Sequence, residues 1–246
     1  MIILVTNDDG INSQGLLALE KSLRELGQVW VIAPDRERNA VGRALTLHRP
    51  LRVEKKSARR FAVNGTPSDC VNLALNGLIP EKPILVVSGI NKGANLGDDI
   101  SYSGTISAAF EATILGVPAF AISLAARSRF KFQPAALFAA ELADKILQHG
   151  LPPDTFLNVN VPDTQGERIT SYKITKQGKS IYDNSVVEKV DPRGGKYYWI
   201  GGDGITFKKI PQSDFEAVSQ NIISITPLKT DYTNYAYLPI LKQWKI

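Results

Sequence analysis

Residues 2–10 read IILVTNDDG, and this stretch joins an unbroken apolar and β-branched run, Ile2–Thr6, directly to two carboxylates. A continuous run of this kind predicts a strand buried on both faces, as in a parallel sheet. Leucines then recur at helical spacing from Leu16 to Leu26, and Gly27 stands where a helix C-cap belongs. We therefore expect a strand–turn–helix unit with the acidic pair at the carboxyl end of the strand.

The alternation of strands and helices continues well into the chain. Apolar runs predict further strands at residues 29–33, 84–88, 119–124, 156–161 and 222–226. Helical spacing with terminal glycine or proline predicts helices at residues 103–115 and 133–149. This order predicts an α/β fold whose parallel sheet is covered by helices on both faces. Ligands of such sheets bind beyond the carboxyl ends of the strands.

Two parts of the sequence depart from this alternation. Residues 44–53 and 59–63 indicate an extended pair inserted before the next helix, and residues 169–210 alternate β-forming residues with glycine and charge, as hairpins do. No linker rich in proline or glycine divides the chain. We therefore expect one domain over residues 1–246, with an α/β core at 1–165 and a β-rich extension at 166–246.

The last residues, 232–246, form an aromatic and apolar arm without a clear cap. Exposing so much apolar surface is unfavourable for a monomer in water. We expect the arm to pack on another subunit; the alternative is that it packs on its own domain.

Composition excludes several kinds of site. Cys70 is the only cysteine, and His48 and His149 are the only histidines, so an intrachain disulfide, a multi-cysteine metal cluster and a three-histidine zinc site are excluded. The net charge of +5 comes from 29 basic and 24 acidic residues, but residues 36–60 alone hold nine basic and two acidic residues. The rest of the chain is slightly acidic, so the basic character belongs to one stretch.

No sequence feature indicates a membrane. The first apolar run has no basic residues before it, and no apolar run approaches the roughly 20 residues of a membrane span. A chain with one thiol fits a reducing compartment. We expect a cytoplasmic protein with no membrane partner.

The acidic pair Asp8 and Asp9 follows the first predicted strand directly. Two adjacent carboxylates at a buried strand end repel each other, and both stay ionised only if a cation or hydrogen bonds compensate. Carboxylate and amide oxygens suit a hard cation such as Mg²⁺ or Mn²⁺. The structural alternative is an Asp-Gly turn with solvated acids.

A glycine-rich segment, SGINKGANLGDD at residues 88–99, follows another predicted strand. Its glycines allow a tight loop whose backbone can approach a ligand, and Asn91 and Asn95 offer neutral oxygens. The alternative is a long structural loop. Ser103, Gly104 and Thr105 then open a helix whose unpaired amides favour a phosphate, or Ser103 is an ordinary N-cap.

Taken together, these segments resemble the survival protein E (SurE) family of nucleotidases. The match spans nearly the whole chain, and the order and spacing of the motifs are specific. The segments that carry it are NDDG (7–10), APDR (33–36), GTPSDC (65–70), SGIN through NLGDD (88–99), YSGT (102–105), NVNVP (158–162), DPRG (191–194) and SITPL (224–228).

The resemblance implies a metal-dependent phosphatase that hydrolyses nucleoside 5′- and 3′-monophosphates, in some members also short polyphosphate. It also implies a Rossmann-like three-layer core with β-hairpin insertions and a C-terminal exchange arm, which build a homodimer or homotetramer. Carried over, the ligands of one Mg²⁺ or Mn²⁺ are Asp8, Asp9, Asn39 and Asn95, with asparagine at position 39 where many members have serine.

These residues define the predicted site. Asp8 and Asp9 are the catalytic carboxylates, and they orient a water or, in a rival scheme, form a covalent phospho-aspartate. The phosphate is held by Asn91, Ser103, Gly104 and Thr105. The competing function is a non-catalytic binder of nucleotides or nucleic acid that uses the basic stretch 36–60. That stretch has few aromatic side chains to stack on bases, which makes a nucleic-acid partner the weaker expectation.

Overall fold

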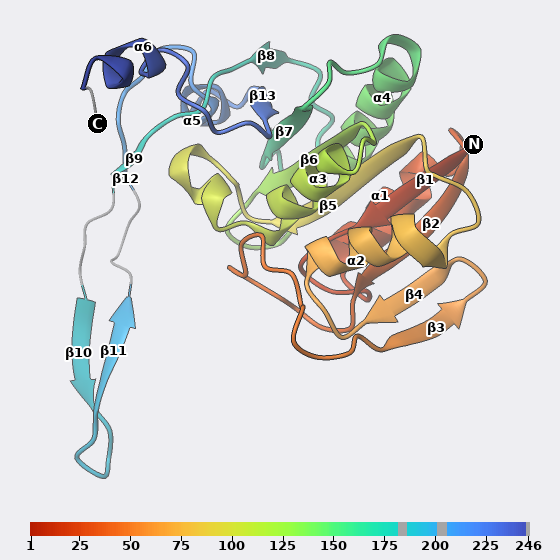
Figure 1. The fold of residues 1–246 in the computed structure, drawn as a ribbon, viewed down its shortest axis with the longest axis horizontal. Coiled ribbons are helices and arrows are strands. Elements are labelled where there is room, and N and C mark those ends of the chain that lie inside the picture. The colour runs from red at the N-terminus through yellow and green to blue at the C-terminus, as the bar shows by residue number, and fades with distance from the viewer. Residues whose placement is uncertain (182–185, 201–205, 245–246) are drawn as a thin grey trace.

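The computed structural model describes residues 1–181, 186–200 and 206–244. Its centre is one nine-stranded sheet (Figure 1). The strands are β1 (Ile2–Thr6), β2 (Gln28–Pro34), β3 (Val53–Ser57), β4 (Arg60–Val63), β5 (Leu85–Lys92), β6 (Ala119–Ala125), β7 (Thr155–Pro162), β8 (Tyr172–Ile174) and β13 (Ile223–Lys229). Their order is β3-β4-β2-β1-β5-β6-β7-β13-β8. The pairs β3–β4 and β7–β13 are antiparallel and the other pairs are parallel.

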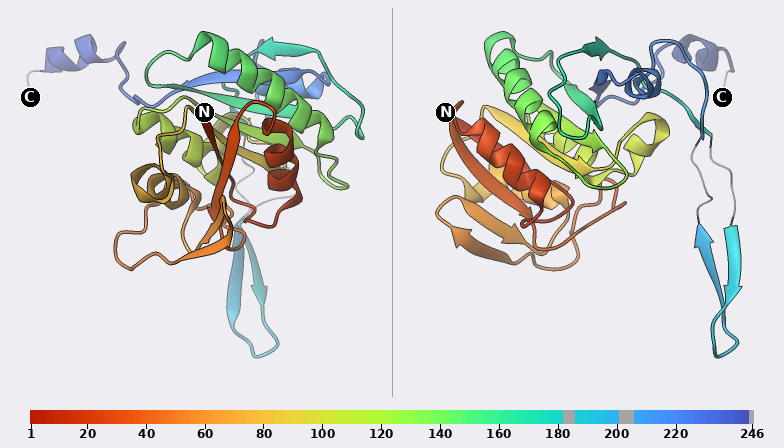
Figure 2. Two further views of the ribbon diagram at one scale, coloured as in Figure 1. Left: turned by 90° about the vertical axis from the view of Figure 1, so that its right-hand side faces the viewer. Right: turned by 180° about the vertical axis from the view of Figure 1, so that it is seen from behind.

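Helices cover both faces of the sheet and make a three-layer structure (Figure 2). The helices that pack on it are α1 (Gln14–Leu23), α2 (Pro67–Leu73), α3 (Gly104–Ile114) and α4 (Gln133–His149). Alternate residues of β1 enter different cores: Ile3 packs with the α1 and α4 side, and Leu4 with the α2 and α3 side. An unbroken apolar strand is therefore what this position requires, and the predicted α/β fold is confirmed.

The predicted extended pair at residues 44–53 and 59–63 is only partly correct. The second segment is β4, but the first strand, β3, begins at Val53 and ends at Ser57. Residues before Val53 bind the start of α2 instead: Thr46 donates through its amide and its hydroxyl to Asp69, at 2.8 and 2.6 Å. These side-chain bonds replace the ladder that a strand would make.

The predicted strand at residues 84–88 is also too short. β5 continues to Lys92, so the first part of the expected glycine loop is strand. The pairing of β5 with β6 shifts register between Gly89 and Asn91. At Gly89 the backbone has φ +145°, and a Cβ there would lie 2.3 Å from the carbonyl oxygen of Ile122. The strand continues because glycine lets the two backbones approach this closely.

The extension after β7 contains hairpins, as predicted. β10 (Val186–Val190) pairs with β11 (Lys196–Ile200), and β9 (Ser180–Ile181) pairs with β12 (Thr206–Phe207). The β10–β11 hairpin points away from the sheet (Figure 1). Residues 182–185 and 201–205 of the predicted hairpin region lie outside the described residues.

The extension does not form a separate body, since its strands β13 and β8 complete one edge of the main sheet. After β13 the chain makes two short helices, α6 (Leu238–Leu241) and the 3₁₀ turn Lys242–Trp244, which lie at the outside of the molecule (Figure 2). Residues 245 and 246 of the arm are outside the described residues. None of the described helices is long and apolar enough to cross a membrane.

The close packing of α1 on β5 gives a test of the fold. A Cβ at Gly15 would lie 2.1 Å from the carbonyl oxygen of Ile90. We expect Gly15→Ala to lower the free energy of unfolding by about 1–3 kcal/mol, because the clash is with backbone. Helix propensity alone would raise it by about 1 kcal/mol. Urea denaturation followed by circular dichroism measures the difference.

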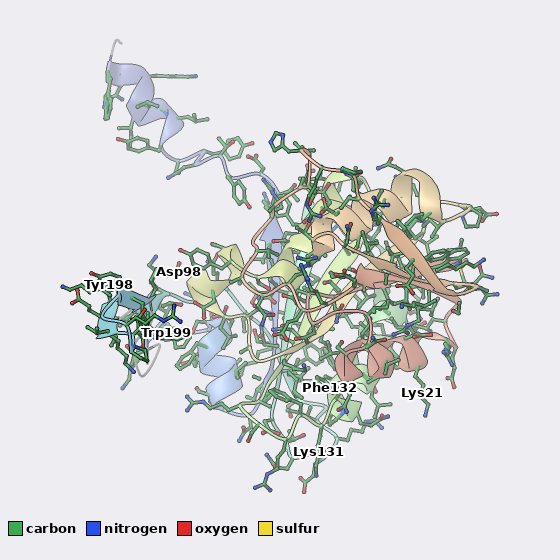
Figure 3. The ribbon with its side chains drawn as sticks, turned by 90° about the horizontal axis from the view of Figure 1, so that it is seen from below. Lys21, Asp98, Lys131, Phe132, Tyr198 and Trp199 are labelled. Atoms are coloured by element: carbon green, nitrogen blue, oxygen red, sulfur yellow. The ribbon has the colours of Figure 1, made fainter. Side chains whose placement is uncertain are left out.

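The matched control is Lys21→Ala on the same helix, where the side chain is exposed and points outward (Figure 3). This change should stay within about 0.5 kcal/mol of the parent. A Gly15→Ala protein as stable as the control would contradict the packing of α1 described here.

Candidate active site

The carboxyl ends of β1, β2 and β5 meet at one cavity of about 260 Å³. The chain passes from β1 to β2 on one side and later returns to β5 on the other, so this is the switch point where α/β sheets bind ligands. The cavity is lined by Asp8, Asp9, Glu37, Asn39, Ala40, Asn91, Lys92, Asn95, Asp99, Tyr102 and Ser103. Six of the eight predicted site residues are among them, and Gly104 and Thr105 lie directly behind Asp8.

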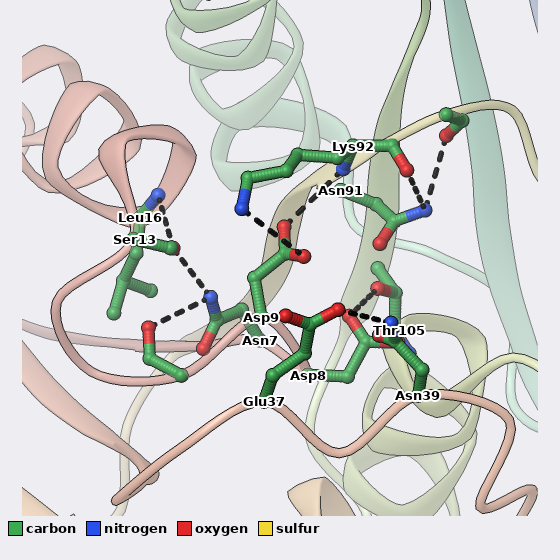
Figure 4. Close-up of polar contacts among 12 residues, drawn as sticks. Asn7, Asp8, Asp9, Ser13, Leu16, Glu37, Asn39, Asn91, Lys92 and Thr105 are labelled. Carbon is green, nitrogen blue, oxygen red and sulfur yellow. Dashed lines mark hydrogen bonds and ion pairs between the residues drawn. The ribbon is translucent and has the colours of Figure 1, made fainter. Parts of the chain in front are cut away.

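Asp8 is fixed by the first turn of α3. The side chain is 4% exposed, and it accepts hydrogen bonds from the Thr105 amide at 3.1 Å and from the Thr105 hydroxyl (Figure 4). A Cβ at Gly104 would lie 2.9 Å from the Cβ of Asp8, so only glycine allows α3 to come this near. In this structure Thr105 therefore orients Asp8, and its hydroxyl is already engaged.

Asp9 is held by the end of β5. Its Oδ2 accepts a bond of 3.2 Å from the Lys92 amide, and its Oδ1 lies 3.9 Å from the Lys92 ammonium (Figure 4). Sequence reasoning missed Lys92 as a site residue, although it stands between Asn91 and Gly93 in the glycine-rich segment.

The two carboxylates share an environment that disfavours charge. Burial raises the pKa of Asp8 from 3.8 to about 6; the bond from Thr105 opposes this rise and the charge of Asp9 adds to it. Burial also raises the pKa of Asp9, where Lys92 lowers it and Glu37 raises it. A bound cation would reverse this penalty for both groups.

Asn95 is positioned by a buried polar network from β7 and β6. Its amide donates to the Oδ1 of Asn160 at 2.8 Å, and its carbonyl oxygen accepts from the side chains of Asn158 and Asn160, both at 2.9 Å. The Asn95 side-chain nitrogen donates to the Ser123 hydroxyl at 2.8 Å. Its Oδ1 is consequently the amide atom left for the cavity.

The sequence contains a signal for this network. Asn158 and Asn160 interrupt the apolar pattern of a predicted strand, and in the structure they are 1% and 0% exposed. The large majority of buried side-chain amides are hydrogen-bonded, so two of them in one strand indicate a specific polar partner. The partner itself, Asn95, is 63 residues away and could not be found from the pattern.

Asn39 lines the cavity from the loop after β2. Its side-chain nitrogen donates to a carboxylate oxygen of Glu37, which leaves the Asn39 Oδ1 available (Figure 4). The loop is attached to the site by the Arg38 amide, which donates to the carbonyl oxygen of Asp8 at 2.8 Å. Glu37 is a second lining residue that sequence reasoning missed.

Asn91 and Ser103 also line the cavity. The Ser103 hydroxyl caps α3 by accepting from the Ile106 amide at 3.2 Å, so the predicted N-cap is present. Asn91 donates through its side chain to the carbonyl oxygen of Gly93 at 3.0 Å, which leaves its Oδ1 free of that bond.

The donor set fits a hard divalent cation. Two buried carboxylates and the oxygens of Asn39 and Asn95 face one cavity, and such oxygens are the ligands of Mg²⁺ and Mn²⁺. Within the described part of the chain no group of three or more His, Cys, Asp or Glu side chains could hold a metal, so a cation here requires the amide oxygens. The buried Asn7 Oδ1, close by on the same turn, has no hydrogen-bond partner.

The fold and the site together define a Rossmann-like α/β protein with a cavity lined by carboxylate and amide side chains at the switch point of its sheet. The sequence model described as "Survival protein SurE" matches residues 3–184 of the chain. The chain belongs to the SurE family, which confirms the resemblance seen in its motifs.

Relatives in sequence and structure agree with this assignment. A protein of Geobacter sulfurreducens is 57% identical over all of this chain and 94% of its own length, and one of Geotalea daltonii is 56% identical over all of both chains. Each carries the name 5′-nucleotidase SurE. The crystal structure of the SurE protein from Aquifex aeolicus has a TM-score of 0.88 and 40% identity over the full length of both chains.

The raised pKa of Asp8 predicts a dependence of stability on pH. A pKa higher in the folded than in the unfolded state means that Asp8 ionisation costs stability as the pH rises through about 6. In EDTA, the unfolding free energy of the parent relative to that of Asp8→Asn should fall by about 3 kcal/mol between pH 4 and 7. Urea denaturation at each pH measures it.

The control is Asp144→Asn, a carboxylate of α4 bonded to Gln148 at the surface. The difference in unfolding free energy between the parent and Asp144→Asn should stay nearly constant with pH. If the difference between the parent and Asp8→Asn were also constant with pH, the raised pKa of Asp8 in the metal-free protein would be contradicted.

Proposed function

We propose that this protein is a divalent-metal-dependent phosphatase that hydrolyses nucleoside 5′- and 3′-monophosphates to nucleoside and phosphate, with short polyphosphate as a further substrate. The observation that carries the proposal is the cavity in which Asp8 and Asp9 meet amide oxygens beside the start of α3. The name 5′-nucleotidase SurE, carried by relatives more than half identical to the whole chain, supports the substrate class.

Asp8, Asp9, Asn39 and Asn95 are the proposed ligands of one Mg²⁺ or Mn²⁺. When bound, the cation would neutralise the carboxylates and withdraw negative charge from a phosphate oxygen. Asn95 offers only its Oδ1, because the side-chain nitrogen is bonded to Ser123. Asn39 likewise offers its Oδ1, because its side-chain nitrogen donates to Glu37.

The phosphate is assigned to Asn91, Ser103, Gly104 and Thr105. Amides in the first turn of α3 carry a partial positive charge, and they face the end of β1 where Asp8 stands. Thr105 contributes mainly through Asp8, to which both its donors are bonded. A helix start is a preformed anion seat, which suits charge that develops on a phosphoryl group.

Asp8 and Asp9 are the proposed catalytic carboxylates. Hydrolysis forms a bond from a water oxygen to phosphorus, breaks the ester P–O bond and delivers a proton to the leaving oxygen. Thr105 occupies both oxygens of Asp8, whereas the Oδ1 of Asp9 has only the 3.9 Å ion pair with Lys92. Asp9 is therefore the freer carboxylate to orient the attacking water and accept its proton.

A binder of nucleic acid that uses residues 36–60 is the weaker alternative. Several cations of this stretch are engaged within the protein: Arg49 donates to the carbonyl oxygen of Asn64 at 3.1 Å, and Arg60 pairs with Glu20. The slightly acidic remainder of the chain also opposes a polyanion.

A cytoplasmic location is part of the proposal, supported by the single, fully buried thiol of Cys70.

The proposal predicts that Asp8→Asn abolishes metal-dependent hydrolysis. Loss of one carboxylate should reduce release of phosphate from AMP by at least about 100-fold, because both cation affinity and charge balance change. Phosphate release with Mg²⁺ or Mn²⁺, and with EDTA, measures the effect; the parent enzyme should lose activity in EDTA and regain it with metal.

Asp144→Asn should retain the activity of the parent, and circular dichroism should show that both variants are folded. A folded Asp8→Asn protein with full activity would overturn the proposed role of the carboxylate pair. Activity in EDTA equal to that with metal would overturn the metal requirement.

We also propose that the arm, residues 232–246, packs on another copy of the chain to make a homodimer or homotetramer. Its described side chains are largely exposed within one chain: Tyr232 is 77%, Tyr235 65% and Trp244 59% exposed. The start of the arm contacts the core, where Tyr232 stacks on Phe110 at 5.5 Å between ring centres.

Deletion of residues 233–246 should therefore lower the oligomeric mass, because the apolar side chains that join the copies are removed. Sedimentation equilibrium measures the mass. Leu241→Asp, a single change within α6, should weaken the assembly in the same direction while the fold is kept. An unchanged mass for both proteins would contradict this role of the arm.

A further inference from the structure

A second polar cavity adjoins the candidate active site. It has a volume of about 330 Å³ and is lined by Asp9, Gly10, Ile11, Asn12, Ser13, Asp35, Arg36 and Lys92. Asp9 and Lys92 also line the first cavity, so the two spaces share a wall made by this ion pair. Apart from Asp9, the proposed cation and phosphate residues do not line the second cavity, which has no part in the function argued so far.

The sizes of the two cavities favour one ligand that occupies both. Pockets for small molecules usually measure roughly 300–1,000 Å³. The first cavity, at about 260 Å³, is below that range, and it is the cavity to which the cation and the phosphate are assigned above. A substrate with its phosphate there needs space for the rest of the molecule, and the neighbouring cavity beyond Asp9 and Lys92 offers it.

The second cavity has unused hydrogen-bonding groups. Within the described part of the chain, the side chains of Asn12 and Arg36 have no hydrogen-bond or ion-pair partner, and both residues are exposed and belong to the cavity lining. The Oδ1 of Asp35 accepts a hydrogen bond from Arg38 at 3.3 Å. This bond holds the carboxylate in place and leaves its Oδ2 to accept from a ligand. These groups can accept from hydroxyls and present a planar cation to a ring.

The charge of the second cavity argues against another phosphate. Two carboxylates, Asp9 and Asp35, stand against two cations, Arg36 and Lys92. A balanced lining suits a neutral, polar ligand better than an anion, since an added anion would face two like charges. The leaving group of a nucleoside monophosphate is such a ligand, because its sugar and base carry no charge at neutral pH.

We propose that this cavity is the leaving-group subsite, which takes the nucleoside part of the substrate; this rests on the function proposed above. Asp35 and Asn12 bind sugar hydroxyls, and the guanidinium of Arg36 lies against the face of the base. Lys92 stands between the two subsites and keeps Asp9 paired beside the substrate. Arg36 thus determines preference for the leaving group and not for the phosphate.

The test compares two substrates that share the phosphate and differ in the leaving group: AMP and methyl phosphate, with the full-length protein and saturating metal. Arg36→Ala should raise the ratio of KM for AMP to KM for methyl phosphate about tenfold. Arg36→Lys should do nearly the same, because it keeps the charge but loses the planar face. Inhibition by adenosine should weaken in both variants, and inhibition by inorganic phosphate should not.

The control is Lys55→Ala, a cation of the same basic stretch that lies on β3 at the sheet edge and lines neither cavity. It should leave both KM values unchanged. Equal changes of KM for both substrates, or no change for either, would overturn the subsite. A parent protein that hydrolyses neither substrate would instead overturn the proposed function, so the two failures are distinguishable.

Discussion

The structure depends on keeping two neighbouring carboxylates at the buried end of a central strand. Asp8 is 4% exposed, and its pKa is raised to about 6 because burial and the charge of Asp9 oppose ionisation. Thr105 and Lys92 offset part of this cost from two different elements. Such an arrangement is unfavourable for a merely structural turn, and it becomes favourable when a cation joins the carboxylates. The electrostatic cost to the fold and the proposed chemistry of the site therefore both come from this pair of carboxylates.

The rest of the site is held by residues that touch no ligand. Asn158 and Asn160 fix the backbone of Asn95, and Ser123 fixes its side chain. Each bond selects one orientation of an amide whose oxygen and nitrogen have nearly the same shape. A fully satisfied buried network of this kind defines the direction of a donor atom more sharply than apolar packing can. The same logic explains Glu37 and Asn39 at the other side of the cavity.

The sequence predicted most strands and helices of the core, and six of the eight residues it singled out line one cavity. It failed where contacts between distant segments decide. The apolar runs and caps gave the strands and helices of the core because each is a local property. The strand expected at residues 44–53 was wrong because Thr46 binds Asp69, a contact that no local pattern contains. Lys92 and Glu37 were missed for the same reason: their importance comes only from Asp9 and Asn39 lying opposite them.

The extension also reaches the site, which its position in the sequence conceals. Asp214 lies well beyond the end of the predicted core at residue 165, and it accepts hydrogen bonds from the Gly97 amide and from the Gly178 amide, both at 2.9 Å. Asp98 accepts from the Ser180 amide at 3.1 Å and pairs with Lys179 at 3.1 Å. The glycine-rich segment that presents Asn95 is thus bound by the extension on one side and by β7 on the other. A loop with so many glycines has high entropy when free, so contacts from both sides are what give its asparagines fixed positions.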